Sequence, residues 1–298
     1  MSENQAPTSP QIALSVRAHD RVGRRRTDQA WLDAVWADPR TRVLRLARGR
    51  FPVVEGGTSL AWSAPEEAPE GQRVFLGERD GVAHFSVLVA EPDEGWPDLR
   101  VVAPALSAGD ASLLVHAVAL AQWHEGHRHC PRCGGRLESA EAGHVLTCTA
   151  CGRQQFPRTD PAVIMLVTDA NDRALLGRQS RWPEGRYSTL AGFVDPGESL
   201  EDAVRREVAE EVGVVVEDVT YFGNQPWPFP ASLMVGFVAR AVTTDITVDG
   251  EEISDARWFT RAQVLEEAQA GTLVLPGGIS ISRSLVEAWY GGHLPGQW

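Results

Sequence analysis

The four cysteines of this chain have a spacing that suits a metal ion. They form two Cys-x-x-Cys pairs separated by fourteen residues, Cys130 with Cys133 and Cys148 with Cys151. Each pair turns the chain so that two thiolates face one point, and together they supply the tetrahedral sulfur set that zinc prefers. Because four thiolates leave no open position for water, we expect one structural Zn²⁺ per chain. The alternatives are four reduced thiols without a metal, or a site that also uses the nearby His124, His127 and His129.

A second group with evident chemistry consists of three glutamates within five residues. Glu207, Glu210 and Glu211 stand at i, i+3 and i+4, so a helix would place their carboxylates on one face. Without a counter-ion these like charges repel by roughly 0.2–0.5 kcal/mol per pair. Hard divalent cations such as Mg²⁺ and Mn²⁺ prefer carboxylate oxygens and would remove that repulsion. The spacing therefore favours a divalent metal site over the alternative, a solvated acidic helix face.

The residues around the glutamates predict a loop followed by one helix. Gly192 and Gly197 flank an Asp-Pro turn signal, Ser199 is a typical helix start, and Gly213 is a typical helix end. The buried stripe of this helix is expected to consist of Leu200, Val204, Val208 and Val212.

This segment carries a pattern of nine specified positions, G-x5-E-x7-R-E-U-x-E-E-x-G-U, where U is a bulky aliphatic residue. They are Gly192, Glu198, Arg206, Glu207, Val208, Glu210, Glu211, Gly213 and Val214. The segment resembles the Nudix box, whose enzymes hydrolyse nucleoside diphosphates linked to another moiety. The resemblance implies an α/β/α sandwich that holds about two to three Mg²⁺ or Mn²⁺ ions against a pyrophosphate.

The resemblance also implies roles for single residues. Glu207 and Glu211 match the main metal ligands, Glu210 an auxiliary one, and the carbonyl of Ala191 a further one. Glu252 matches a late metal-binding glutamate, or is a solvated charge at a strand edge. Arg206 and Glu198 would pair to fix the loop on the helix. Glu211 is the first choice to orient or deprotonate the attacking water, with Glu207, Glu210 and Glu252 as alternatives.

A proline-rich loop after the box narrows the substrate. Its residues are Gln225, Pro226, Trp227, Pro228, Phe229, Pro230, Ala231 and Ser232. Three prolines restrict the backbone, so that the two aromatic rings and the polar ends form a pre-organised binding surface. The loop resembles the SQPWPFPxS signature of NADH pyrophosphatases, which also carry a zinc ribbon before the Nudix domain. Asn224 stands where that family has serine.

The family resemblance implies cleavage of NAD(H) to nicotinamide mononucleotide and AMP, removal of NAD caps from RNA 5′ ends, and a homodimer with sites at the subunit interface. Phe156 and Phe193 match aromatic positions that sandwich the nicotinamide ring, or are core residues. Ser282 matches a backbone contact near the C-terminal helix. The alternatives are a Nudix diphosphatase for ADP-ribose or another dinucleotide, and a catalytically inactive zinc-ribbon protein that binds RNA.

The length of 298 residues predicts two domains at about 150 residues each. We place an N-terminal α+β domain at 1–127, the zinc ribbon at 128–157 and a Nudix α/β/α sandwich at 158–298, so the fold class is mixed α+β and α/β. The N-terminal domain has no motif, and we expect it to serve packing or dimerisation. Its pattern predicts strands at 74–77 and 82–89 and a helix at 109–123. Strands are also expected at 162–167 and 233–239.

The charge of the chain limits its partners. With 28 basic and 40 acidic residues, the formal net charge is −12. This balance argues against binding to duplex DNA or to an anionic membrane surface, although a capped RNA 5′ end remains a plausible substrate. No apolar run is long enough to cross a membrane, and Met1–Pro10 shows no secretory signal pattern, so we expect a cytoplasmic protein.

Overall fold

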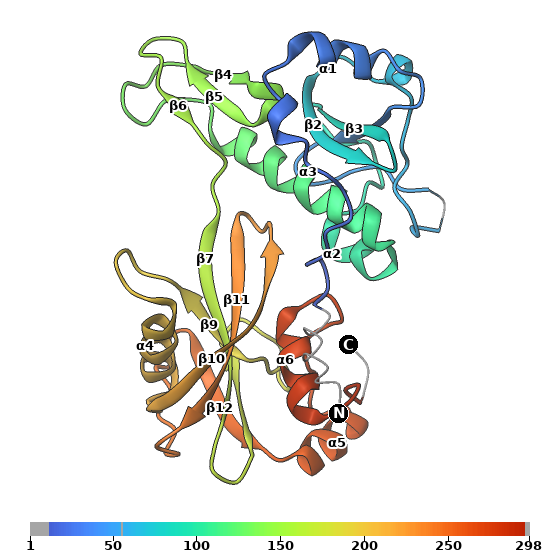
Figure 1. The fold of residues 1–298 in the computed structure, drawn as a ribbon. Coiled ribbons are helices and arrows are strands. Elements are labelled where there is room, and N and C mark those ends of the chain that lie inside the picture. The colour runs from blue at the N-terminus through green and yellow to red at the C-terminus, as the bar shows by residue number, and fades with distance from the viewer. Residues whose placement is uncertain (1–11, 55, 296–298) are drawn as a thin grey trace, which may run out of the picture. The chain divides into compact units, whose positions relative to one another are not determined.

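The computed structural model describes residues 12–54 and 56–295 of the chain, which form two compact units (Figure 1). The N-terminal unit comprises residues 16–159 and 227–232, and the C-terminal unit comprises residues 12–15, 160–226 and 233–295. None of the described helices is long and apolar enough to span a bilayer. The expectation about Met1–Pro10 concerns residues outside the described part of the chain.

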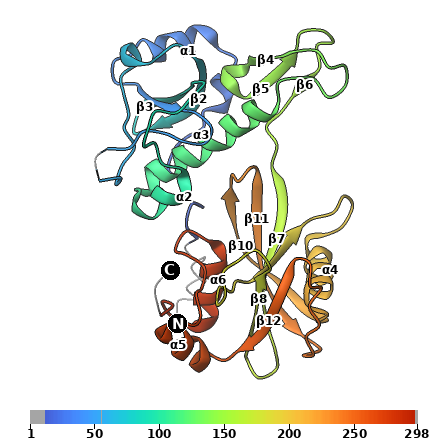
Figure 2. The same cartoon turned by 180° about the vertical axis from the view of Figure 1, so that it is seen from behind.

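The N-terminal unit is built on a three-stranded sheet with the order β1-β3-β2 (Figure 2). Strand β1 runs parallel to β3, and β2 runs antiparallel to it. The long helix α3 packs against β1 and β2, and it starts at Ser107, whose hydroxyl accepts from the N–H of Asp110. The elements are η1 (Gly23–Arg25), α1 (Gln29–Trp36), β1 (Arg42–Leu46), η2 (Pro65–Glu67), β2 (Gln72–Arg79), β3 (Val82–Leu88), α2 (Leu99–Val102), η3 (Ala103–Ala105) and α3 (Ala108–Gly126).

The cysteine-containing segment forms a small antiparallel sheet of its own within the N-terminal unit. Its strands pair in the order β4-β5-β6, with Leu137 opposite Cys148 and Leu146 opposite Gln155. The elements are β4 (Leu137–Ala140), η4 (Glu141–Gly143), β5 (Val145–Cys148) and β6 (Gln154–Gln155).

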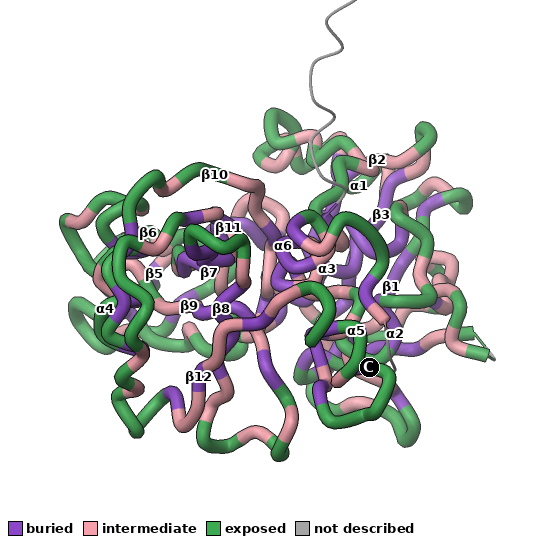
Figure 3. The backbone as a smooth tube through the Cα atoms, turned by 90° about the horizontal axis from the view of Figure 1, so that it is seen from below, coloured by how far each residue is buried: buried purple, intermediate pink, exposed green. Residues whose placement is uncertain are grey.

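The C-terminal unit is a six-stranded sheet whose main path is β10-β11-β7-β8-β12, with β9 paired to β7. Successive side chains of β7 point to opposite faces, as the strand geometry requires. Val163 and Met165 enter one core and Ile164 and Leu166 enter the other. Strand β7 is therefore buried along most of its length (Figure 3). The strands are β7 (Asp160–Thr168), β8 (Ala174–Gln179), β9 (Leu190–Phe193), β10 (Val216–Trp227), β11 (Ser232–Ala241) and β12 (Ile253–Phe259).

Helices cover both faces of this sheet. Helix α4 (Leu200–Val212) lies on one face, and α5 (Arg261–Ala270) and α6 (Ile281–Tyr290) lie on the other (Figures 1 and 2). This arrangement is the α/β/α sandwich that the sequence predicts. The mixed fold class is confirmed as well, since the N-terminal unit has its own sheet and helices beside the cysteine-containing sheet.

Most of the individual elements also agree with the prediction. The helix expected at 109–123 is α3, and the strands expected at 74–77, 82–89, 162–167 and 233–239 are β2, β3, β7 and β11. Helix α4 begins after Ser199 and ends at Gly213, which has the left-handed conformation at φ 70°. Four of these five elements extend beyond the predicted ends by a few residues, whereas β3 ends at Leu88, one residue before the predicted end.

Candidate functional site

Helix α4 turns two of the three clustered glutamates inward. The hydroxyl of Ser199 accepts from the N–H of Asp202 at 3.1 Å and caps the helix. Its apolar stripe packs into one of the two cores, with Val204, Val208 and Val212 fully buried. Because the register of the stripe fixes the rotation of the helix, Glu207 and Glu211 are only 9% and 4% exposed. Glu210 points to solvent.

Strand β9 approaches the Glu207 carboxylate so closely that any side chain at position 192 would displace it. A Cβ atom on Gly192 would lie 1.9 Å from Cδ of Glu207 and 2.1 and 2.2 Å from its two oxygens. The missing side chain thus creates the space that the carboxylate fills. The glycine of the sequence motif has a steric reason rather than a conformational one.

Glu211 is an acid buried without full compensation. Its Oε2 has no hydrogen-bond partner among the described residues, and the backbone N–H of Ala191 donates to the carboxylate. Burial raises the pKa of Glu211 to about 8, and the nearby charges of Glu207, Glu252 and Asp249 add to the effect. Burial also raises the pKa of Glu207. A divalent cation beside these two carboxylates would relieve both the repulsion and the missing contact.

Arg206 ties the loop before α4 to the helix. Its guanidinium donates to Glu198 at 2.5 and 3.1 Å, and to the carbonyl of Phe193 at 2.9 Å. The predicted pairing of Arg206 with Glu198 is therefore confirmed. The same guanidinium donates to Glu207 at 2.9 Å and to Glu210 at 3.0 Å. Glu198 is the main reason why the pKa of Arg206 is raised, so this cation keeps its charge beside the acids.

Glu252 lies in a turn just before β12, with its side chain exposed. Its charge contributes to the raised pKa of both Glu207 and Glu211, so Glu252 lies close enough to act on these two carboxylates of α4. Asp249 holds the turn, because its carboxylate accepts from the N–H groups of Glu252 at 3.0 Å and Ile253 at 2.9 Å. Sequence reasoning missed Asp249, although the Asp-Gly pair that it opens is a turn signal.

The acidic residues do not yet form a closed ligand set. Among the residues that the structure describes, only the four cysteines bring three or more ligand atoms within 4.8 Å of one another. Arg206 also donates to one carboxylate oxygen of Glu207 and to one of Glu210. The carboxylate oxygens nevertheless suit a hard divalent ion, and so does the buried Oε2 of Glu211, which has no hydrogen-bond partner among the described residues.

Gln225, expected to offer hydrogen bonds to a ligand, is completely buried and bonded inside the C-terminal unit. Its Nε2 donates to the carbonyls of Ala13 at 2.5 Å and Ile279 at 2.7 Å, and its Oε1 accepts from the N–H of Ile281 at 2.9 Å. Both amide hydrogens are thus used. Gln225 fixes the end of β10 to the start of α6.

The aromatic residues of the proline-rich loop belong to the N-terminal unit and are half-buried there. Trp227 and Phe229 meet edge to face at 5.1 Å, and the guanidinium of Arg100 lies 3.9 Å from the centre of the Phe229 ring. The Phe229–Pro230 peptide bond is cis. Asn224, which replaces the family serine, donates to the hydroxyl of Tyr221 at 2.7 Å.

The remaining predicted site residues divide into exposed and buried ones. Phe156 in the N-terminal unit and Phe193 in the C-terminal unit are 65% and 60% exposed, so the alternative that they are core residues is wrong. Ser282 is buried, and its hydroxyl meets the hydroxyls of Ser188 at 2.8 Å and Thr189 at 2.7 Å. Ser282 therefore connects α6 to the residues before β9.

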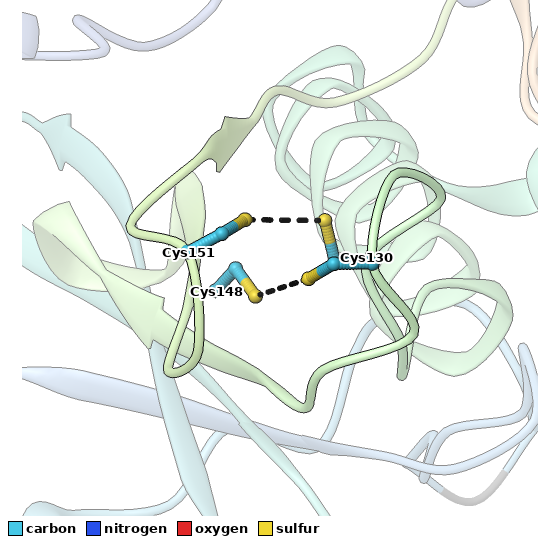
Figure 4. A group of neighbouring side chains, drawn as sticks. Cys130, Cys148 and Cys151 are labelled. Carbon is cyan, nitrogen blue, oxygen red and sulfur yellow. Dashed lines mark hydrogen bonds between the residues drawn. The ribbon is translucent and has the colours of Figure 1, made fainter.

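The four cysteines converge as their spacing predicts (Figure 4). The Sγ atoms of Cys130 and Cys151 are 3.8 Å apart, and those of Cys133 and Cys148 are 3.5 Å apart. Bonds from the backbone N–H groups of Cys151 and Ala150 lower the pKa of Cys148 to about 7, which favours a thiolate. A Cβ at Gly135 would lie 2.9 Å from the Sγ of Cys148, so glycine is needed here too. None of the three nearby histidines belongs to this set.

Three family models match the chain in succession. Residues 40–123 match an NADH pyrophosphatase-like rudimentary NUDIX domain, residues 126–156 an NADH pyrophosphatase zinc ribbon domain, and residues 158–274 a NUDIX domain. The zinc ribbon match and the four converging sulfur atoms agree on a structural zinc site, and the NUDIX match implies a divalent metal in the C-terminal unit.

Similar proteins cover nearly the whole chain. The NAD-capped RNA hydrolase NudC of Mycobacterium bovis (strain BCG / Pasteur 1173P2) is 40% identical over 295 residues, which is 93% of this chain and 94% of the relative. The NAD-capped RNA hydrolase NUDT12 of Macaca fascicularis is 43% identical over 329 residues, which is 91% of this chain and 71% of the relative.

Proposed function

Because the chain belongs to the NADH pyrophosphatase family of Nudix hydrolases, we propose that it hydrolyses the pyrophosphate bond of NAD(H) to nicotinamide mononucleotide and AMP, and that it removes NAD caps from RNA 5′ ends. One observation supports the catalytic part of this proposal above the others. It is the buried pair Glu207 and Glu211: the carboxylate of Glu207 lies against Gly192, and Oε2 of Glu211 has no hydrogen-bond partner among the residues that the structure describes.

The residues that would hold the divalent ions are Glu207 and Glu211, with Glu210, Glu252 and the carbonyl of Ala191 as further ligands. A bound Mg²⁺ or Mn²⁺ supplies neutralisation of the pyrophosphate charge and acidification of water. The number of ions, about two to three per site, is part of the proposal. In it, Glu211 orients the attacking water or takes its proton.

Other residues of the chain keep these groups in position. Arg206 holds the loop through Glu198 and the carbonyl of Phe193, so that the backbone of β9 stays against α4. Gly192 leaves space for the Glu207 carboxylate. Asp249 fixes the turn that presents Glu252. Such fixed positioning is worth several orders of magnitude in rate, because the reacting groups need no reorganisation.

We propose that the nicotinamide end of the substrate binds to the exposed rings of Phe156 and Phe193 and to the loop Gln225–Ser232. The support is that both phenylalanines present large apolar surface to solvent, which a planar ring can cover. Within the loop, Trp227 and Phe229 are the candidates for direct contact. Gln225 acts as a positioning residue, since its amide is bonded to the backbone.

Three further features belong to the proposal. We propose a homodimer, as the family resemblance implies, which the molar mass in solution would test. The cytoplasm is the proposed location, since four thiols grouped for a metal suit a reducing compartment. Each chain would carry one Zn²⁺ with a structural role, held by Cys130, Cys133, Cys148 and Cys151.

A comparison of substrates tests the proposed activity. NADH, NAD⁺, ADP-ribose and NAD-capped RNA are offered at matched concentrations with Mg²⁺ or Mn²⁺, and products are separated chromatographically. We expect release of nicotinamide mononucleotide from NADH and from capped RNA. Preferred turnover of ADP-ribose would show a different Nudix substrate, and binding of RNA without any hydrolysis would show an inactive RNA-binding protein.

A further inference from the structure

A cavity of about 470 Å³ lies between the C-terminal end of α3 and the zinc ribbon, inside the N-terminal unit. This volume falls in the range of roughly 300–1,000 Å³ that is typical of small-molecule and cofactor sites. The lining residues are Gln72, His124, His127, Arg128, His129, Arg136, Leu137, Ser139 and Leu146. Two arginines and three histidines line it, and no acidic residue does.

The two arginines of the lining contrast with the protein as a whole, whose formal net charge is −12. Arg128 and Arg136 are exposed, and neither forms an ion pair among the described residues. Leu137 and Ser139 of β4 line the cavity, whereas Glu138 between them does not. The reason is that successive side chains of a strand point to opposite faces.

The backbone holds this lining in place. His129 and Arg136 form an isolated antiparallel bridge, and the N–H of Leu137 donates to the carbonyl of Arg128 at 3.1 Å. The two arginines are thus fixed at the two sides of one short hairpin. Chain segments far apart in the sequence close the cavity, since Gln72 comes from β2 and Leu146 from β5.

The histidines are not equally available to a ligand. His124 is held by the carbonyl of Gly143 at 2.8 Å and by the amide of Gln72 at 2.9 Å. The ring of His127 contacts the carbonyl of Trp123 through Nδ1 at 2.9 Å, so its Nε2 remains free to bond outward. His129 is exposed and has no hydrogen bond from its ring among the described residues. Planar rings of this kind stack on unpaired bases.

A metal ion does not explain this arrangement. The histidine nitrogens do not come within 4.8 Å of one another as a set of three. Two other arginines of the zinc ribbon do not contribute to this lining. Arg132 lies between two of the cysteines and Arg153 follows the last one, and neither lines the cavity.

We propose that this cavity binds the phosphodiester backbone of single-stranded RNA, with Arg128 and Arg136 contacting phosphates and His127 and His129 stacking against a base. The proposal rests on the proposed function, in which capped RNA is a substrate. It adds a second place of contact that a free dinucleotide does not need. The cavity therefore makes the enzyme prefer NAD carried on an RNA chain over NAD alone.

The test compares two pairs of substitutions that remove the same charge. Arg128→Gln with Arg136→Gln changes the cavity, and Arg132→Gln with Arg153→Gln is the matched control in the same ribbon. The probe is an NAD-capped single-stranded RNA longer than the roughly 4 to 16 nucleotides that a compact single-strand-binding fold covers. The measurements are KM and kcat for this RNA and for NADH at several salt concentrations.

We expect the cavity variant to raise KM for capped RNA about tenfold near physiological salt, and to leave kcat and the NADH kinetics unchanged. The logarithm of the affinity for RNA falls linearly with the logarithm of the salt concentration. Loss of two phosphate contacts should make this slope shallower by about 1.4, since each contact contributes about 0.7 on single strands. The control pair should change neither value by a comparable amount. Equal effects of the two pairs would overturn the proposal, as would an unchanged salt slope in the cavity variant.

Two further experiments distinguish a failure of the cavity proposal from a failure of the proposed hydrolase function. Direct binding of the same RNA with a 5′-monophosphate, followed by fluorescence anisotropy, needs no turnover. If the wild-type protein hydrolyses nothing yet binds this RNA through Arg128 and Arg136, the proposed function fails and the cavity proposal stands. If the double variant does not fold, each single variant should reduce the salt slope by about 0.7, and no reduction would refute the proposal.

Discussion

Replacement of Gly192 by alanine tests whether the position of the Glu207 carboxylate matters for catalysis. A Cβ at this position would lie 1.9 Å from Cδ of Glu207, whereas contacts below 3.0 Å are essentially absent from real proteins. The carboxylate must therefore move by at least about 1 Å. Because it is the far end of a flexible side chain, the movement needs no change of the backbone.

The expected loss of rate follows from this displacement. Misplacement of a reacting group by about 1 Å costs about 100-fold in rate, which corresponds to about 2.7 kcal/mol in the activation barrier. The free energy of unfolding should change by no more than about 1 kcal/mol, because the substitution adds one methyl group next to a side chain that can move. We therefore expect Gly192→Ala to lose most of its activity and to keep most of its stability.

The assay measures kcat for NADH at saturating Mg²⁺, together with the urea midpoint of unfolding. Gly278→Ala is the matched control, since a Cβ there meets no atom within 4 Å and its φ is not in the left-handed region. We expect normal turnover in the control and about a 100-fold loss in Gly192→Ala. Normal turnover in Gly192→Ala would refute the reasoning, and so would a loss of activity that is fully explained by unfolding.

Removal of zinc by a chelator, or Cys148→Ser, should lower the thermal midpoint by about 5 °C or more, checked by calorimetry beside the zinc content per chain. Gln225→Met should cost on the order of 3 kcal/mol in urea unfolding, because it leaves one buried and two partly buried backbone groups unpaired; an unchanged midpoint would contradict the assigned role. Burial lowers the pKa of His84 and of His144 to about 4 from the ordinary 6.5. Since the unfolded chain then binds protons first, the contribution of these two histidines to stability should be complete above pH 6.5 and fall by a few kcal/mol as the pH drops toward 4. His144→Gln should flatten this dependence in urea titrations followed by tryptophan fluorescence, and an equally steep slope would speak against it.

The reactive residues could be predicted from the sequence because their signals are local. In α4, the cap at Ser199, the stop at Gly213 and the apolar stripe lie within fifteen positions, so they determine which glutamates share a face. The cysteine pairs behave in the same way, because each knuckle positions two sulfur atoms by its own turn. No long-range contact is needed for either prediction.

Other features depend on contacts between distant segments, which a single sequence does not display. The steric need for Gly192 arises only when β9 lies against α4. Gln225 looked like a ligand-binding amide because its neighbours are aromatic, yet its partners Ala13 and Ile279 come from the two far ends of the chain. Likewise, Glu252 influences Glu211 because the turn that Asp249 holds places it nearby.

The N-terminal half has no sequence motif that relates it to the C-terminal half, so its sequence predicts only an α+β domain. The family comparison describes residues 40–123 as a rudimentary NUDIX domain. The box residues that carry the signal in the C-terminal half have no counterpart in the N-terminal sequence. A sheet and its helices can keep their arrangement without the chemistry that identifies them in sequence.

The central claim is that the buried acids of α4 carry a metal-dependent hydrolysis, and Glu211→Gln tests it most directly. The measurement is the rate of nicotinamide mononucleotide release from NADH by the wild-type protein and by the variant, each titrated with Mg²⁺ and Mn²⁺, with unfolding curves as the check on the fold. We predict a folded variant whose turnover is largely abolished at every metal concentration. Near-normal turnover of Glu211→Gln in excess Mg²⁺ would contradict the account.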